Sequence, residues 1–435
     1  MTQNVDRFGN SVLVSSPASR DAMDSFALEL LSQGRNAAAI VDAAAQDAGC
    51  ALLQAYTACL FLFLQTREGY RRASPYITAA LQAPGGERER AFVDAVADWW
   101  RGDEHHALRK FQAIAARWPR DVVTLKIAQI LQINCGDAHG MRALMTHAIR
   151  SADDIGYAWG LLAFALIECG ETQAAEHAGR RAVEMTLDDP WAHHAVAHVL
   201  TTSDRIEEGL TWMQGLSPTW DRCSSFIYTH NWWHTALLLL DLGDHRAALD
   251  LYDNRVWGYR KGHVQDQVNA VSLLARLELA GVDVGDRWAD VGAHVAARIG
   301  DTVNSFLDLH AWYGLVRAGD DDGVANFLDA MEACACSDRP DSAVWRAITL
   351  PVARGMRAFA AGDFAATLSH MNGVREQVYR VGGSAVQREW FEMIALSAER
   401  ELRGEDGRLF NARMAHLLDA GRERSAHRLD TRAVA

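Results

Sequence analysis

Helix-turn signals recur along this 435-residue chain at a nearly constant spacing, and this period constrains its fold more than any other feature. A Gly or an Asp separates two apolar helical segments at ten positions: Gly34, Gly69, Gly102, Gly136, Gly170, Asp204, Gly243, Gly281, Gly319 and Gly362. A helical hairpin of this size cannot bury its apolar face alone, so neighbouring hairpins must stack into one continuous core. The period therefore predicts an all-α fold built as a single α-solenoid.

The segment from Tyr157 to Leu187 shows the repeat in detail. Trp159, Leu162 and Leu166 form an apolar stripe at helical spacing, and Gly170 ends that helix. The same stripe returns 34 residues later in the next unit. A period of about 34 residues is that of a tetratricopeptide helix–turn–helix unit. We therefore predict a tetratricopeptide-like α-solenoid of about ten to eleven helical hairpins, curled into a superhelix.

The solenoid pattern covers most of the chain. We assign residues 1–19 to an N-terminal extension, residues 20–420 to the single solenoid and residues 421–435 to a charged C-terminal tail. Near the C-terminal end of the solenoid, Ser384 and Gln387 have the spacing of a capping box, in which each side chain bonds an unpaired backbone amide. A helix is therefore expected to begin after Ser384.

Composition and charge exclude several classes of protein. The formal net charge is −13 and no basic stripe is present, which argues against a nucleic-acid partner. No apolar run reaches the ~18–20 residues of a membrane span, and the N-terminal region lacks the pattern of a secretory signal. The seven cysteines do not have the spacing of a disulfide framework. We therefore expect a reduced, cytoplasmic protein without a nucleic-acid or membrane partner.

Histidines cluster in the middle of the chain. Five of the 17 histidines fall within a stretch of about forty residues: His193, His194, His198, His230 and His234. His194 and His198 are four residues apart, as are His230 and His234, and this spacing places each pair on one face of its helix. The two helices open consecutive repeats, so we expect them to lie side by side.

The repeat also predicts which side chains face the groove. In a tetratricopeptide unit the first helix lines the concave surface, and the alignment places His194, His198, His230 and Trp233 there. The first helices of later repeats add polar residues that would share this surface if the solenoid curls enough: Asp266, Asn269, Asp308, His310 and Arg388.

Three interpretations of the histidine cluster follow from its residue types. The histidines can bond one another and the backbone in a structural polar seam. They can form a metal-free site that binds a ligand or acts as general acid and base, since imidazole titrates near neutral pH. They can also hold a divalent metal ion, because neutral imidazole is a common zinc ligand. Spacing alone does not choose among the three interpretations.

Several stretches resemble the tetratricopeptide repeat protein 38 family. They are residues 188–198 (DDPWAHHAVAH), 230–234 (HNWWH), 269–277 (NAVSLLARL) and 382–384 (GGS). The resemblance extends from about Ser16 to about Leu417 and implies a helical-repeat protein without a generally assigned activity. It also implies that one group of residues is important, without indicating whether the group binds a ligand, catalyses a reaction or stabilises the fold: His193, His194, His198, His230, Asn231 and His234.

The leading functional hypothesis is a binding protein whose concave, histidine-rich pocket holds a small polar ligand or a peptide end. The ligand-binding candidates are His193, Asn231, Trp233, Asp266, Asn269, Asp308, His310 and Arg388. The alternative is an enzyme, for instance a hydrolase, whose catalytic candidates are His194, His198, His230 and His234. A scaffold for protein partners is the third hypothesis. The sequence leaves open both a bound metal and a homodimer.

Overall fold

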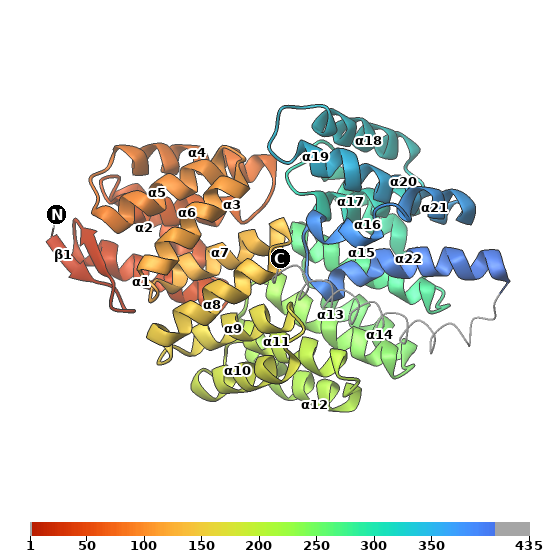
Figure 1. Cartoon of the computed structure of the whole chain (residues 1–435), viewed down its shortest axis with the longest axis horizontal. Helices are drawn as coiled ribbons and strands as arrows, with labels where there is room; N and C mark the ends of the chain where they lie inside the picture. The colour runs from red at the N-terminus through yellow and green to blue at the C-terminus, as the bar shows by residue number, and fades with distance from the viewer. Residues whose placement is uncertain (1, 405–435) are drawn as a thin grey trace, which may run out of the picture.

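The computed structural model describes residues 2–404 and confirms the all-α solenoid. Ten helical hairpins follow one another along the chain and pack against their neighbours (Figure 1). The helices pair as α1 (Pro17–Leu31) with α2 (Ile40–Gln46), α3 (Ala51–Leu62) with α4 (Arg67–Gln82), α5 (Glu87–Trp100) with α6 (Glu104–Arg117), α7 (Val122–Cys135) with α8 (Ala138–Ala152), α9 (Gly156–Ile167) with α10 (Thr172–Met185), α11 (Pro190–Thr202) with α12 (Ile206–Leu216), α13 (Ser225–Asp241) with α14 (His245–Leu251), α15 (Val264–Leu279) with α16 (Arg287–Val295), α17 (Ser305–Ala318) with α18 (Asp321–Ala335), and α20 (Leu350–Ala360) with α21 (Phe364–Met371).

A long final helix and several short helical segments complete the described chain. Helix α22 (Ala385–Arg403) begins at the predicted capping box, in which Ser384 and Gln387 bond each other's backbone amides. The short segments are η1 (Ala37–Ala39), η2 (Ser217–Arg222), η3 (Tyr252–Val256), η4 (Ala296–Arg298), α19 (Ser342–Val344), η5 (Trp345–Thr349) and η6 (Arg375–Val381). The predicted tail at residues 421–435 and the predicted end of the solenoid at residues 405–420 lie outside the described residues.

The predicted turn residues end the first helix of most hairpins in the left-handed conformation. Eight of the ten have φ between +56° and +85°: Gly102, Gly136, Gly170, Asp204, Gly243, Gly281, Gly319 and Gly362. In the first two hairpins Gln33 and Gln65 take this role, with φ of +55° and +49°. Gly69 instead lies in the first turn of α4, where a Cβ atom would approach the carbonyl oxygen of Phe61 to 2.5 Å. Its lack of a side chain therefore serves helix packing and not turn formation.

The N-terminal extension contains a β-hairpin that the sequence did not predict. Strands β1 (Thr2–Val5) and β2 (Ser11–Val14) pair antiparallel, and Val12 and Val14 are buried against the solenoid. The buried guanidinium of Arg88 anchors the hairpin, because it bonds Asp121 of α7 at 2.5 Å and also contacts Asp6. Four-residue strands carry too little alternation to be distinguished from loops in the sequence.

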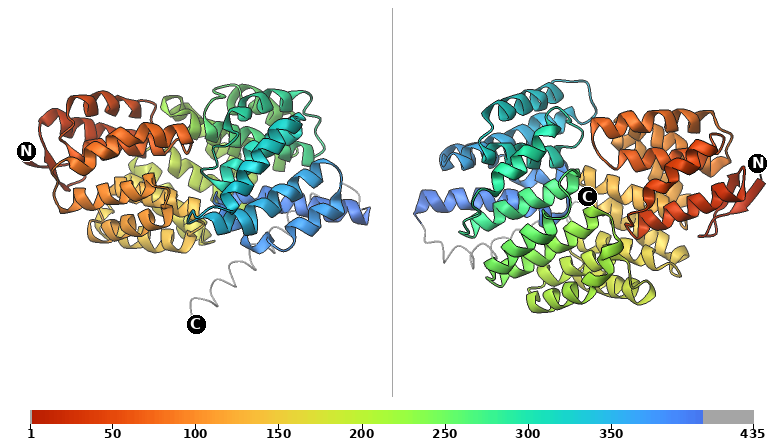
Figure 2. Two further views of the ribbon diagram at one scale, coloured as in Figure 1. Left: turned by 90° about the horizontal axis from the view of Figure 1, so that it is seen from above. Right: turned by 180° about the vertical axis from the view of Figure 1, so that it is seen from behind.

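The solenoid curls until its C-terminal part returns to the middle of the molecule (Figures 1 and 2). Segment η6 packs against α7, and a Cβ atom on Gly136 would approach the carbonyl oxygen of Tyr379 to 2.3 Å. The backbone amide of Ala385 donates to the carboxylate of Glu168, at the end of α9, at 3.0 Å. Another contact between the two halves joins the start of α4 to the loop before α17, where the backbone amide of Arg67 donates to Asp301 at 3.0 Å. Long-range contacts therefore join the two halves of the superhelix.

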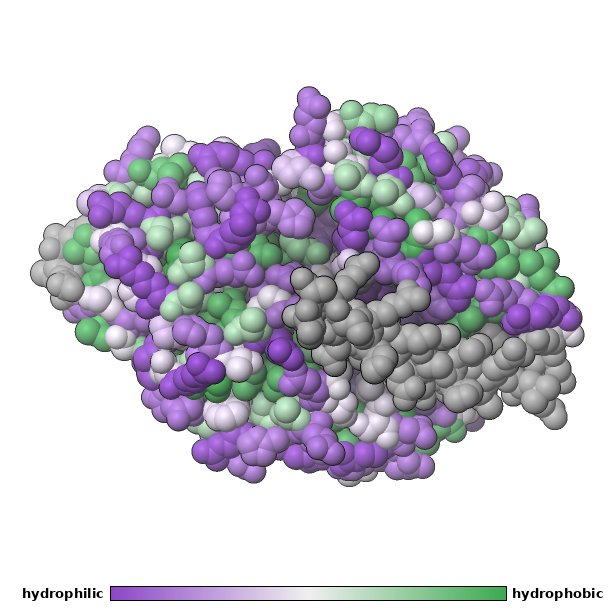
Figure 3. Space-filling view, in the orientation of Figure 1, coloured by the Kyte–Doolittle hydropathy of each residue, from purple (hydrophilic) through white to green (hydrophobic). Residues whose placement is uncertain are grey.

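The face shown in Figure 3 is largely hydrophilic, with apolar residues scattered over it in small groups. Within residues 2–404, no helix combines the length and the apolar character needed to cross a membrane.

The contact between Gly136 and Tyr379 can be used to test how closely η6 packs against α7 where the solenoid curls back on itself. We expect Gly136→Ala to destabilise the fold more than Gly170→Ala. Both glycines have left-handed backbone, but a Cβ atom on Gly170 meets nothing within 4 Å. Left-handed backbone costs alanine about 1–2 kcal/mol, and the clash at Gly136 adds about 1–3 kcal/mol. Urea denaturation measures the free energy of unfolding of both variants. Equal losses would show that η6 does not pack closely enough against Gly136 to exclude a Cβ atom.

Candidate functional site

Helices α11 and α13 bring the two predicted histidine pairs together. His194 and His198 lie on α11, and His230 and His234 lie on the facing side of α13. The four side chains are between 1% and 3% exposed, so all four are buried. Five pairs among the four rings have centroids 4.4 to 4.9 Å apart. We call His194, His198, His230 and His234 the histidine tetrad.

One ring nitrogen of the tetrad lies within hydrogen-bond distance of two others. His194 Nε2 is 2.8 Å from His198 Nε2 and 3.1 Å from His230 Nε2. Among the described residues, His194 Nδ1 and His234 Nε2 have no hydrogen-bond partner. Buried polar atoms in folded proteins are nearly always paired, so these two atoms need an explanation.

A chain of hydrogen bonds fixes the orientation of His230. The Thr229 hydroxyl donates to Asp266 Oδ1 at 2.7 Å, and Asn269 Nδ2 donates to the same hydroxyl at 3.1 Å. The amide oxygen of Asn269 therefore accepts the Nδ1 proton of His230, at 2.9 Å. This leaves His230 Nε2 with a lone pair that points into the tetrad.

Aromatic rings enclose the tetrad and exclude water from it. The His194 ring stacks on Phe164 and lies against Trp191, with centroids 5.2 and 4.8 Å apart. The His230 ring stacks on Trp233 at 5.3 Å and also packs against Phe226. The amine of Lys126 (α7) lies over the Trp191 ring, with Nζ 3.5 Å from the ring centroid.

Burial keeps three of the four histidines uncharged. Desolvation lowers the pKa of His230 to about 4, against an opposing effect of the Asn269 hydrogen bond. Desolvation, followed by repulsion from neighbouring rings, lowers the pKa of His194 and of His234 well below the usual value. Neutral imidazoles carry lone pairs, so His194, His230 and His234 form a cluster of electron-pair donors at pH 7.

Glu168 links the tetrad to the C-terminal part of the chain. Its carboxylate lies 3.9 Å from His198 Nδ1 and accepts from the Ala385 amide. The guanidinium of Arg388 is 3.9 Å from the same carboxylate, and burial lowers the pKa of Arg388. Burial also raises the pKa of Glu168. The end of α9 and the start of α22 therefore meet beside His198.

Not every predicted residue joins the tetrad. His193 faces the other side of α11, where Trp220 Nε1 donates to its Nδ1 at 3.1 Å. Asn231 donates to the carbonyl of Pro190 at 3.3 Å. Asp308 pairs with Arg298 at 3.0 Å. These three side chains hold neighbouring segments of the solenoid together.

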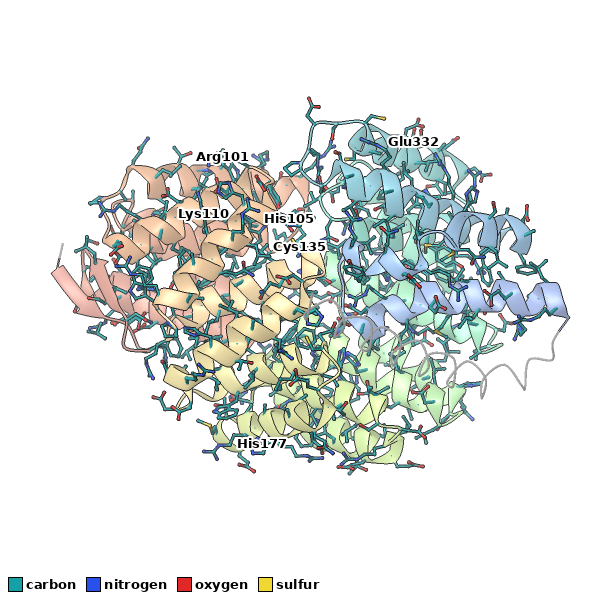
Figure 4. All side chains as sticks on the ribbon, in the orientation of Figure 1. Arg101, His105, Lys110, Cys135, His177 and Glu332 are labelled. Atoms are coloured by element: carbon teal, nitrogen blue, oxygen red, sulfur yellow. The ribbon has the colours of Figure 1, made fainter. Side chains whose placement is uncertain are left out.

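His310 of α17 occupies a separate aromatic site. Its Nδ1 lies 2.7 Å from the carbonyl oxygen of Phe306, and its ring packs against Trp390 of α22 at 4.8 Å. Histidines elsewhere in the chain differ in burial: His105 of α6 and His177 of α10 are exposed (Figure 4).

The sequence analysis missed Lys126, Thr229 and Glu168. Lys126 is 1% exposed, and its Nζ has no hydrogen-bond partner among the described residues. A signal for it was present, because Lys126, Gln129 and Gln132 interrupt an apolar helix at spacings of three residues. Gln129 supports the site by accepting from Trp191 Nε1 at 2.9 Å.

Fold and site together define a helical-repeat protein of the α-solenoid class with a buried polar centre. No family model matches the chain. One similar solved structure is "Structure of Naa15/Naa10 bound to HypK-THB", at 13% identity and a TM-score of 0.26. The match covers 88% of this chain and 65% of that chain, so this chain spans about two thirds of its length. At this TM-score the match gives no information on function.

The low pKa of His310 predicts a pH-dependent stability. Burial lowers the pKa of His310 to about 3, whereas an unfolded histidine titrates at about 6.5. The unfolded state therefore binds more protons between these values, and stability is lost as the pH falls below about 6.5. From pH 8 to pH 5, wild type should lose about 2 kcal/mol more than His310→Phe. Urea denaturation at both pH values checks this, and identical losses would contradict it.

Proposed function

We propose that this protein binds a small polar ligand at the histidine tetrad. The observation that carries the proposal is a group of buried polar atoms near Trp191 and the tetrad without a partner in the described chain. Lys126 Nζ, His194 Nδ1 and His234 Nε2 are among them. Leaving such a group unpaired costs about 1–3 kcal/mol, so a bound ligand that pairs with these atoms would recover that energy.

The chemistry of the surroundings restricts the ligand. Lys126 and neutral histidines offer N–H donors, which suits a ligand with carboxylate, phosphate or carbonyl oxygens. Phe164, Trp191 and Trp233 surround the site and favour a ligand of small size. A peptide end would meet the same donors through its carboxylate. A scaffold role does not require buried donors, although stacked hairpins also provide extended outer surfaces.

We also propose a relationship to the tetratricopeptide repeat protein 38 family and a cytoplasmic location. The motifs that carry the resemblance include the four tetrad residues and Asn269. A homodimer remains an open proposal, tested by the mass of the protein in solution.

Thermal shift assays with small carboxylates and phosphates test ligand binding. We expect at least one compound to raise the melting temperature of wild type, since a ligand at about 100 times its Kd adds about 2.7 kcal/mol. His234→Ala and Lys126→Met should lose this shift because each removes a buried polar atom that has no partner in the described chain. His177→Ala is the matched control, since His177 is exposed on α10. Equal shifts in all four proteins would place the ligand elsewhere, and the absence of any shift would reject this ligand class.

A second candidate function is acid–base catalysis. The chain of hydrogen bonds from Asp266 through Thr229 and Asn269 holds His230 in one tautomer, with an Nε2 lone pair that faces His194 Nε2 at 3.1 Å. General bases in enzymes are oriented in this way. The lone pair on His230 Nε2 would accept the proton as the general base.

The hydrolysis of p-nitrophenyl acetate tests the catalytic candidate. We expect Asn269→Leu to lower the rate at least ~10-fold, because general-base catalysis contributes about 10²–10⁴-fold. Asn304→Leu is the control, since Asn304 caps α17 and has no contact with the tetrad among the hydrogen bonds of the described residues. A wild-type rate no higher than that of buffer would eliminate this candidate.

A further inference from the structure

The geometry points to a divalent transition-metal ion, such as zinc, bound by His194, His230 and His234. One ring nitrogen from each of these residues lies within 4.8 Å of the other two, and all three residues are buried. A fourth imidazole is next to these three, because His198 Nε2 lies 2.8 Å from His194 Nε2. This inference rests on the proposed function and names the group through which the ligand is held.

The proton count of the tetrad favours a cation. His230 Nε2 presents a lone pair because its proton is on Nδ1, bonded to Asn269. His194 Nε2 contacts that lone pair at 3.1 Å and His198 Nε2 at 2.8 Å. A single proton on His194 Nε2 can serve both contacts only as a shared, weakened hydrogen bond. A metal ion accepts a lone pair from each ring and removes the conflict.

The distances are close to those of a tetrahedral site. Zinc–nitrogen bonds of about 2.0–2.1 Å place two tetrahedral nitrogen ligands about 3.3 Å apart. His194 and His230 are already 3.1 Å apart at Nε2. The nitrogens of all three residues lie within 4.8 Å of one another, so the His234 ring has to move closer to the other two when a metal binds.

The supporting residues suit a metal ligand. A metal-bound histidine usually donates its second N–H to a carbonyl or carboxylate, and His230 donates to Asn269 in a chain that ends at Asp266. Three imidazoles without a carboxylate ligand favour zinc, copper, nickel or iron over magnesium or calcium.

Charged side chains around the site affect how favourably it binds a metal cation. Lys126 and Arg276 lie near His194 and His234 and disfavour additional positive charge when protonated. Burial lowers the pKa of Lys126 to about 7 and that of Arg276 to about 9. The carboxyl group of Glu168 lies 3.9 Å from His198, and that of Asp266 ends the hydrogen-bond chain from His230. In the ionised form each would offset part of the metal charge. An anionic ligand on the metal would be paired with Lys126.

Metal analysis of the full chain, followed by reloading, tests the inference. The protein is stripped with a chelator and titrated with Co²⁺ and with Zn²⁺, and visible absorption of the Co²⁺ form reports tetrahedral nitrogen ligation. We expect one metal per chain and at least a ~100-fold loss of affinity in His230→Ala. Asn269→Leu should lose about 10–100-fold, because it removes only the supporting hydrogen bond. His105→Ala is the control on an exposed histidine.

The outcomes separate this inference from the proposed function. Circular dichroism shows whether each variant is folded, and Asn269→Leu keeps the test valid if His230→Ala does not fold. Stoichiometric metal in wild type, bound more weakly by both His230→Ala and Asn269→Leu, supports the inference. Metal bound equally by wild type and Asn269→Leu, or not bound by wild type, overturns it. A thermal shift with carboxylates or phosphates in metal-free wild type would then leave the proposed function standing.

Discussion

The need of each helical hairpin to bury its apolar face determines this structure. Hairpins α1–α2 to α20–α21 satisfy it by stacking in chain order, and the curl of the stack brings η6 and α22 back to α7 and α9. Once the stack has closed, residues on the inner helices lose contact with water. Polar side chains at these positions must then find partners inside the protein, or bind a ligand or an ion that pairs with them.

The histidine tetrad shows how closure creates a chemical site. The i, i+4 spacing places two imidazoles on each of α11 and α13. Burial behind Phe164, Trp191 and Trp233 keeps His194, His230 and His234 uncharged. Neutral imidazoles in a dry, aromatic setting are strong electron-pair donors. Glu168 connects this site to the start of α22, so the closure of the superhelix and the environment of His198 share one carboxylate.

Local patterns predicted most of the fold because helices and turns are local structures. The period gave all ten hairpins, and eight of the ten turn residues have left-handed backbone. Gly34 and Gly69 do not, since neighbouring glutamines take the strained conformation in those hairpins. The β-hairpin at Thr2–Val14 was not predicted, because its stability comes from Arg88 and from burial against distant helices.

The sequence by itself determined the helical hairpins, their order and the two histidine pairs, since each depends on residues only a few positions apart. Only the tertiary structure decided which polar residues share one site. It placed Lys126, Thr229 and Glu168 beside the tetrad, and it turned His193 and Asn231 toward other contacts. The physical reason is that the curl of the superhelix, set by the sum of all hairpin contacts, fixes which faces meet at its centre.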